Sequence, residues 1–279
     1  MKLFLPGFVL VILSFVLKPN HIAYVLGDIG YWVTVIAVLV AIYQEKPTLP
    51  TEESSRTNSF DLFYHNRILS RLFRTLPHVL QTELRDCHTI LDLGCGPNSP
   101  IASCASIRRS VGVEPFRPYF EKAQQRKTHT ELLNCRIEDL VLPDHSFDAV
   151  VLIEVIEHME EAQALEVIRK AQRWASKKVI LTTPNGFVPQ GEVDGNRLQC
   201  HLSGWPLAKL QGLGFRCVGL AGLKILRRDA HAEVMTEDLL ASIRWRPRRL
   251  WFAVAAVSQL LTYRLPSLAF GLFGVQNIE

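Results

Sequence analysis

Apolar residues are concentrated at the start of the chain, in two stretches with almost no charge. Residues 3–17 carry no charged side chain, and residues 22–43 carry only Asp28. At about 1.5 Å per residue, a helix over the second stretch is about 33 Å long, which is enough for the roughly 30 Å hydrocarbon core of a bilayer. A helix over the first stretch reaches only about 22 Å.

Three interpretations of this front segment compete. A secretory signal peptide needs a small-residue cleavage site, and the sequence SFVLKPNH offers none. Two buried helices of a soluble domain are the second, but the stretch YWVTVIAVLVAIY has no polar face. We therefore favour a membrane anchor of one or two transmembrane helices over residues 1–46. If both insert, Lys2 shares a side with Lys46 and Arg56, and the positive-inside rule places the rest of the chain in the cytoplasm.

The remaining chain divides by its pattern into a tether, a core and a tail. Residues 47–59 are polar and rich in proline and serine, which is typical of a linker. A globular core is expected over residues 60–229, starting with a helical apolar spacing from Phe60 to Leu84 that is interrupted at Pro77. In the tail, residues 230–279, a helix broken at Pro247 is expected over 239–261, followed by a last strand. Its arginines beside tryptophans suit a membrane surface, with an ordinary solvated basic face as the alternative.

A strand, a glycine turn and an acid form the first candidate site. TILDL, residues 89–93, reads as a buried strand, and Ser99 with Pro100 predicts the start of a helix. Gly94 and Gly96 between them would let a ligand approach the backbone. The next strand ends in Glu114, where an acid reaches ribose hydroxyls in nucleotide-binding α/β folds. A tight turn without ligand and a solvated strand end are the plainer alternatives.

The order Asp92-x-Gly94-x-Gly96-x-Asn98 resembles the first motif of class I S-adenosylmethionine-dependent methyltransferases, in which the last position is usually glycine. The resemblance covers residues 60–226. It implies an α/β, Rossmann-like, seven-stranded and mostly parallel sheet, whose last strand is antiparallel at the sheet edge. It also implies S-adenosyl-L-methionine as cofactor, with its cationic methionine half near Asp92.

The adenine end of that cofactor site departs from the family pattern. An Asp often faces adenine there, and its place falls on Arg136 in this sequence. Glu138, Asp139 or the backbone of Ile137 are the candidates to replace it. The expected cofactor-binding residues are therefore Asp92, Gly94, Cys95, Gly96, Glu114, Ile137, Glu138, Asp139 and Glu154.

The stretch VLIEVIEHMEE holds the second candidate site, because an apolar strand runs directly into Glu154, Glu157 and His158. Their i, i+3, i+4 spacing puts them on one face of a helical turn, and ligands of parallel sheets bind beyond the carboxyl ends of the strands. E-x-x-E-H resembles the small-RNA terminal 2′-O-methyltransferases and the ubiquinone-pathway O-methyltransferases. In the first group these residues, and a histidine four residues before a tryptophan, hold a divalent metal; His201 and Trp205 match that spacing.

The resemblance therefore makes Glu154, Glu157, His158 and His201 candidate ligands of Mg²⁺, Mn²⁺ or Zn²⁺, with Glu157, His158 and His201 as the catalytic residues. Two alternatives stay open. His158 or His201 could act as a plain base or binder without metal, or these side chains could have structural roles.

Net charge and cysteine spacing restrict the classes of function that fit this sequence. The net charge of +4 is too small to indicate a nucleic-acid partner by itself. The six cysteines form no C-x-x-C pair, which excludes that kind of zinc site and indicates a reduced compartment. The leading expectation is a membrane-anchored methyltransferase that O-methylates a small-molecule or lipid-linked acceptor, a glycan or an isoprenoid. An RNA 2′-O-methyltransferase and a non-catalytic S-adenosylmethionine-binding module are the alternatives.

Overall fold

The computed structural model describes residues 67–228 and 242–278. The anchor expected over residues 1–46 and the tether over 47–59 lie outside the described residues. Among the helices within the described ranges, none has both the length and the apolar character needed to cross a bilayer. The sheet and the helices that cover it belong to one compact unit, residues 57–244 and 255–279, whereas residues 245–254 group with a second unit.

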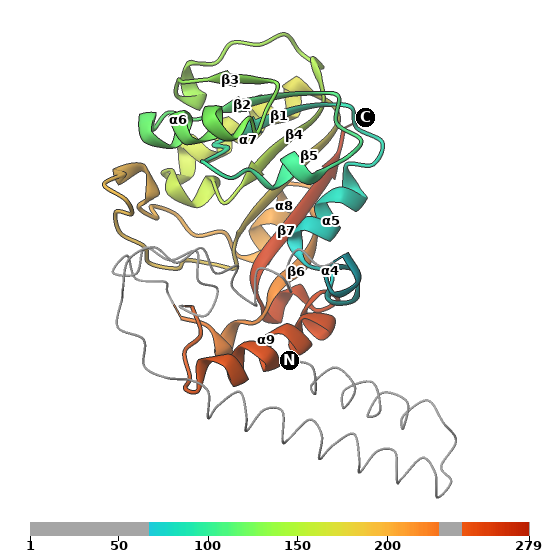
Figure 1. Cartoon of the computed structure of the whole chain (residues 1–279), viewed down its shortest axis with the longest axis vertical. Coiled ribbons are helices and arrows are strands. Elements are labelled where there is room, and N and C mark those ends of the chain that lie inside the picture. The colour runs from blue at the N-terminus through green and yellow to red at the C-terminus, as the bar shows by residue number, and fades with distance from the viewer. Residues whose placement is uncertain (1–66, 229–241, 279) are drawn as a thin grey trace, which may run out of the picture. The chain divides into compact units, whose positions relative to one another are not determined.

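The core of the fold is a seven-stranded sheet with the order β3-β2-β1-β4-β5-β7-β6 (Figure 1). The strands are β1 Thr89–Leu93, β2 Arg109–Val113, β3 Glu131–Leu133, β4 Phe147–Ile153, β5 Ala175–Pro184, β6 Arg216–Leu223 and β7 Ala269–Asn277. Strands β1 to β5 pair in parallel, and β7 is antiparallel to both of its neighbours. The expected α/β, mostly parallel seven-stranded sheet is thus confirmed.

The predicted position of the last strand was wrong in one respect. β7 is antiparallel as expected, but it lies between β5 and β6, so that β6 takes the sheet edge. The burial of the two strands explains this order. Four consecutive residues of β7, from Leu272 to Val275, are buried, as an interior strand requires, whereas β6 is buried at fewer positions.

Each face of the sheet is covered by its own apolar layer, because successive side chains of a strand point to opposite faces. Leu91 and Leu93 of β1 share one cluster with residues of α7 (Glu161–Trp174) and α8 (Leu207–Gly212). Ile90 of the same strand belongs to the opposite cluster, with residues of α5 (Leu76–Glu83) and of the turn η1 (Pro100–Ser103).

The helices differ from the sequence expectation mainly in their lengths. The interruption expected at Pro77 occurs earlier, at Arg74 and Thr75, and Pro77 lies in the first turn of α5. Ser99 is confirmed as an N-cap, accepting a hydrogen bond from Ile101 N at 3.3 Å, but only a single 3₁₀ turn follows it. The other elements are α4 Arg67–Phe73, α6 Arg117–Arg126, η2 Ile137–Asp139, η3 Ile156–His158, η4 Arg197–Gln199, η5 Lys224–Leu226, α9 Arg248–Thr262 and η6 Pro266–Leu268.

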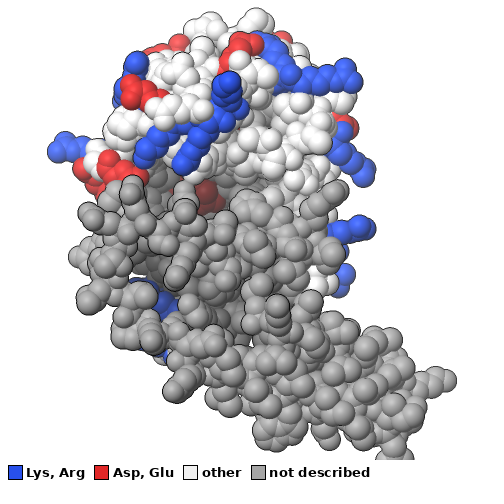
Figure 2. All heavy atoms as spheres, in the orientation of Figure 1, with Lys and Arg blue, Asp and Glu red and all other residues white. Residues whose placement is uncertain are grey.

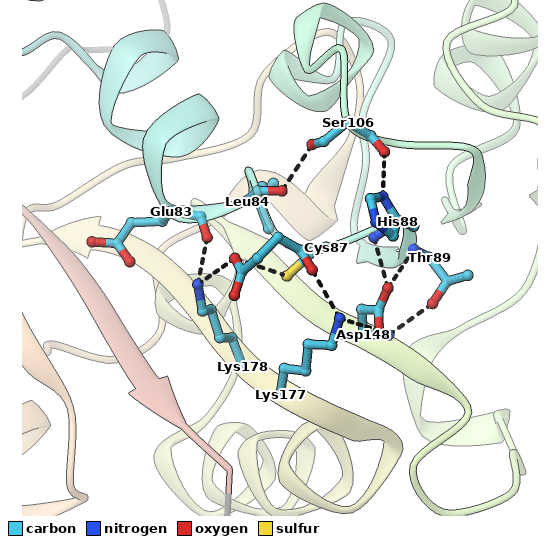
Figure 3. A network of polar contacts seen from close by, with 10 residues as sticks. Glu83, Leu84, Cys87, His88, Thr89, Ser106, Asp148, Lys177 and Lys178 are labelled. Carbon is cyan, nitrogen blue, oxygen red and sulfur yellow. Dashed lines mark hydrogen bonds and ion pairs between the residues drawn. The ribbon is translucent and has the colours of Figure 1, made fainter.

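A polar network joins the amino ends of β1, β4 and β5 (Figure 3). Asp148 Oδ2 accepts hydrogen bonds from the backbone N–H groups of His88 and Thr89, at 2.6 and 3.1 Å. Its other oxygen pairs with Lys177 Nζ at 2.9 Å. The neighbouring Lys178 Nζ donates to Glu83 O at 2.7 Å, so the network also holds α5 against the sheet.

Candidate functional site

The carboxyl ends of β1, β2 and β4 border a cavity of about 190 Å³. Its lining includes Gly94, Gly96 and Glu114, residues 136–138, and the four residues Glu154, Val155, His158 and Met159 after β4. The remaining wall comes from residues 196–199 and Leu202, within the long loop after β5. The site is therefore built from the positions where parallel α/β sheets usually bind their ligands.

The two glycines of the turn after β1 have different roles. Both adopt a positive φ, +69° at Gly94 and +59° at Gly96. A Cβ at Gly94 would lie 2.8 Å from Val155 Cγ2, so packing excludes a side chain there. A Cβ at Gly96 would have no neighbour within 4 Å, because this position opens onto the cavity. Gly96 is thus the point at which a ligand can approach the backbone.

Glu114 fastens this turn to the end of β2. It is 5% exposed, and its oxygens accept hydrogen bonds from Gly96 N at 3.0 Å and from Phe116 N at 2.8 Å. Burial raises the pKa of its carboxyl group, and these two hydrogen bonds oppose the rise. Each carboxylate oxygen can accept a further hydrogen bond, so a pair of hydroxyl groups fits beside Gly96. The ribose of S-adenosylmethionine provides such a pair. The turn with Gly96, together with Glu114, therefore fits this cofactor, and we call these residues the cradle.

The other expected residues of the turn point elsewhere. Asp92 is 1% exposed and is not among the residues that line the cavity. Its Oδ2 accepts hydrogen bonds from the hydroxyl of Ser99 at 2.5 Å and from Nε2 of His129 at 3.0 Å. Cys95 is buried, and burial raises the pKa of its thiol, which keeps it neutral. His129 follows no motif, and sequence reasoning missed it.

At the end of the cavity, Arg136, Ile137 and Glu138 line the wall and Asp139 does not. Glu138 Oε1 accepts hydrogen bonds from Gln163 Nε2 and, at 3.4 Å, from Arg136 Nη2. Burial acts to raise the pKa of Glu138, but these hydrogen bonds outweigh it and lower the pKa. Glu138 is thus an ionised acceptor at this end, and Gln163 is a lining residue that sequence analysis did not identify.

Glu157, His158 and His201 come together although the histidines are far apart in the sequence. Each offers one possible ligand atom, and these atoms all lie within 4.8 Å of one another. The two imidazole rings have centroids 4.7 Å apart. The fourth candidate ligand, Glu154, is exposed and lies outside this group, although it lines the cavity.

Backbone hydrogen bonds hold His201 in this group. The N–H groups of Leu202 and Ser203 donate to Glu157 O at 2.8 and 3.1 Å. The indole of Trp205, which is fully buried, donates from Nε1 to Ile156 O at 3.2 Å. The segment after His201 is therefore fixed to the turn that carries Glu157 and His158, which explains the H-x-x-x-W spacing in structural terms.

The electrostatics of this group are unusual. Glu157 is 1% exposed, and neither of its carboxylate oxygens has a hydrogen-bond partner among the described residues. Burial, and then the charge of Glu154, raise its pKa well above the usual 4.5. Thr183 lies near this carboxyl group, but its hydroxyl also has no hydrogen-bond partner among the described residues. Burial and the neighbouring His201 lower the pKa of His158 to about 4, so this imidazole is neutral at physiological pH.

Residues 91–181 match the family model described as a methyltransferase domain. An (S)-coclaurine N-methyltransferase of Thalictrum flavum subsp. glaucum is 26% identical over 110 residues, covering 36% of this chain and 29% of that protein. An uncharacterized methyltransferase of Schizosaccharomyces pombe is 26% identical over 159 residues, covering 52% of this chain and 54% of that protein.

This chain thus spans less than two thirds of either relative's length. A solved S-adenosylmethionine-dependent methyltransferase from Archaeoglobus fulgidus is 14% identical, covers 76% of this chain and 99% of its own, and superposes with a TM-score of 0.43. The family match covers the glycine turn, Glu114, and the strand that leads to Glu157 and His158. Residues 91–181 therefore match a methyltransferase domain, over the part of the chain whose motifs resemble the class I, S-adenosylmethionine-dependent methyltransferases.

Proposed function

We propose that this chain transfers the methyl group of S-adenosylmethionine to an oxygen of a small-molecule or lipid-linked acceptor. The observation that carries the proposal is a single cavity that joins the Gly96–Glu114 cradle to His158. The bound cofactor supplies an already activated methyl group, so that a positioned acceptor needs little beyond proximity and a base. The cradle supplies the positioning of the donor, and His158 is the candidate base.

His158 suits the role of base because its imidazole is unprotonated at neutral pH. Its Nδ1 is buried and has no hydrogen-bond partner among the described residues, so this nitrogen is available to accept a proton. With a pKa of about 4, the acid limb of the rate profile is expected near pH 4 rather than near the usual histidine value of 6.5. A rate that instead halves near pH 6.5 would assign the titrating group to another residue.

The same group also supports a divalent metal. A buried carboxylate without hydrogen bonds is costly, and an ion held by Glu157, His158 and His201 would satisfy it. Two imidazoles and a carboxylate suit Zn²⁺ or Mn²⁺, and the ion would lower the pKa of an acceptor hydroxyl. A chelator should then stop turnover while S-adenosylmethionine affinity stays constant. If chelator leaves the rate unchanged while His158→Ala is inactive, His158 acts as a plain base.

We further propose that residues 1–46 anchor the chain in a membrane, with the catalytic domain on the cytoplasmic side. The apolar stretch 22–43 supports this proposal. Such a location favours lipid-linked, glycan or isoprenoid acceptors over soluble ones. A reporter placed after Arg56 that proved to be extracytoplasmic would contradict the orientation.

RNA 2′-O-methylation is the second candidate, and the triad of Glu157, His158 and His201 favours it. Charge does not. On the face shown in Figure 2, basic and acidic side chains of the described residues are interspersed around a largely uncharged centre. RNA binding usually needs a broader basic surface.

One experiment separates the candidates. Purified full-length protein with methyl-labelled S-adenosylmethionine is offered either a membrane lipid extract or total RNA, and the labelled fraction is recovered. Label in lipid supports the leading proposal, and label in RNA supports the second. Cofactor binding by calorimetry without transfer to either would leave a non-catalytic binding module.

A further inference from the structure

From residue 255 on, helix α9 has its polar residues on the buried side and apolar residues on the exposed side. Gln259 and Thr262 are 5% and 0% exposed. The exposed side continues past the end of the helix, through the turn η6. Its apolar residues, which we call the α9 surface, are Val257, Leu260, Leu261, Leu265 and Leu268, each between 39% and 50% exposed. A helix that faces water normally has the opposite arrangement.

Hydrogen bonds to β6 fix this orientation of α9. Gln259 Nε2 donates to Gly219 O at 3.0 Å, and Gln259 Oε1 accepts from Gly222 N at 2.9 Å. The contact is close, since a Cβ at Gly219 would lie 2.2 Å from Thr262 O. Rotating the helix to bury its leucines would break these bonds and leave Gln259 without partners. The apolar side therefore has to find a partner outside the sheet.

Charge indicates what kind of partner fits. Residues 239–278 contain five arginines and neither aspartate nor glutamate. Arg244 and Arg246 precede the helix, Arg248 and Arg249 are its first two residues, and Arg264 follows its end. Trp245 and Trp251, whose ring centroids are 6.4 Å apart, lie among them. Basic residues and tryptophans that adjoin an apolar helix in the sequence suit an anionic membrane surface.

We propose that the α9 surface lies on an anionic phospholipid bilayer. At about 1.5 Å per residue the fifteen residues of α9 extend about 22 Å, too short to cross a hydrocarbon core of roughly 30 Å, so the helix lies along the bilayer and does not span it. A second copy of the chain is a poorer occupant. A two-fold contact through this surface would bring two identical sets of arginines together without acids to neutralise them.

The turn that carries Leu268 is joined to the long loop after β5, of which residues 196–199 and Leu202 line the cavity. Asn185, at the start of the long loop, donates from Nδ2 to the carbonyls of Pro266, Ser267 and Ala269 at 3.1–3.3 Å. That loop carries His201 and, near its start, Phe187, which is 55% exposed. If the methyltransferase function proposed above holds, this arrangement places the acceptor in the bilayer, with its apolar part in lipid. The docking itself does not depend on that function.

Site-specific photocrosslinking tests the docking. Leu261→benzoylphenylalanine in the full-length chain is irradiated in vesicles of phosphatidylcholine with and without phosphatidylglycerol. The matched control is Val141→benzoylphenylalanine, because Val141 is an even more exposed apolar residue, at 93%, and shares the same N-terminal tether. We expect several-fold more lipid adduct at 261 than at 141, decreasing when phosphatidylglycerol is omitted. Equal lipid labelling at both positions would overturn the proposal.

The identity of the crosslinked adduct shows which molecule or segment covers the α9 surface. If position 261 links to residues 1–66 or to a second chain instead of lipid, the proposal is wrong. A second variant then tests the surface as a whole: adding Val257→Glu and Leu260→Glu should remove lipid labelling at 261 while S-adenosylmethionine affinity stays unchanged, which shows that the domain is folded. Retained labelling would overturn the proposal. Since no acceptor is present, an inactive enzyme leaves these readouts unaffected.

Discussion

Two acids associated with strand β4 have opposite environments. Asp148, near the amino end of the strand, receives two backbone hydrogen bonds and an ion pair. Glu157, just beyond the carboxyl end, receives none from the described residues. Burial acts to raise the pKa of both; at Asp148 the contacts with His88, Lys177 and Thr89 outweigh it and lower the pKa. One strand therefore connects an acid that stabilises the fold with one whose burial carries a cost, as acids at proposed functional sites often do.

This difference has a consequence for pH. A carboxyl group whose pKa is lowered in the folded state stabilises it above the unfolded pKa, and that stability is lost as the pH falls. Asp148 stabilises the fold in this way above its usual pKa of 3.8, and this stabilisation is lost as the pH falls below that value. A group whose pKa is raised does the reverse. The ionised form of Glu157 destabilises the folded state relative to the protonated form, so stability decreases as the pH rises above its usual pKa of 4.5.

The largest expected effect is at the cradle. Gly96→Arg should abolish S-adenosylmethionine binding, because the new side chain enters the cavity onto which this position opens. The domain should stay folded, at a cost of about 1–2 kcal/mol for the left-handed backbone. Calorimetric titration measures binding and urea unfolding measures stability. Gly94→Arg is a poorer test, since packing against Val155 predicts loss of the fold as well. Normal affinity of Gly96→Arg would show that the cofactor binds elsewhere.

The second prediction separates function from stability at Glu157. Glu157→Gln keeps the shape of the side chain and removes its charge. Turnover should fall by about 10²-fold or more, as when a catalytic acid–base group is lost. Metal-free protein should become more stable by about 1–3 kcal/mol at a pH high enough to ionise Glu157 in the wild type, because a buried charge without partners is removed. Labelled-methyl assays and urea unfolding give the two numbers. A variant that is less stable and fully active would reverse the comparison.

Asp148→Asn is the corresponding test at the other end of the strand. It removes the ion pair with Lys177 and weakens the bonds from His88 and Thr89 (Figure 3). We expect a loss of about 1–3 kcal/mol in the free energy of unfolding at pH 7. The loss should shrink as the pH falls through about 4. Cofactor affinity, measured by titration, serves as the control and should not change. Unaltered stability would mean that the network contributes nothing.

The smallest effect is expected at a contact between α6 and the long loop after β5, part of which lines the cavity. The hydroxyl of Tyr119 donates to Asp194 Oδ2 at 2.8 Å, joining α6 to the long loop. Tyr119→Phe should weaken the attachment of the loop to α6 by about 0.5–1.5 kcal/mol. S-adenosylmethionine should then dissociate a few times faster. Stopped-flow displacement measures this rate. Asp194→Asn, which keeps an acceptor oxygen, should have a weaker effect, and equal rates in all three proteins would show that the loop does not retain cofactor.

Much of the fold could be predicted because local signals agreed with the tertiary structure. The buried strands, the capping role of Ser99 and the mostly parallel sheet all follow from residue pattern and a motif. The sheet order at β7 could not be read locally. Whether an apolar strand is interior or at an edge depends on the pairing chosen by a distant segment, here Arg216–Leu223.

The site was predictable to a similar extent. The resemblance carried by E-x-x-E-H and H-x-x-x-W grouped Glu157, His158 and His201, and the three side chains do lie together. Asp92 shows the limit of such reasoning. Its motif suggests a ligand contact, but its carboxylate is hydrogen-bonded to His129, which lies between α6 and β3. Long-range partners of this kind leave no periodic signal in the sequence.

The position of β7 has a consequence for synthesis. Among the strands of the described residues, β6 joins the sheet only through β7, which follows it in the chain. While the ribosome is still translating α9, the finished β5 has an open edge and β6 has no strand to pair with. Unpaired edges of this kind are prone to aggregation. The nascent domain therefore has an exposed interval late in translation, and synonymous codons that slow elongation between residues 224 and 268 should lower its soluble yield more than slow codons elsewhere.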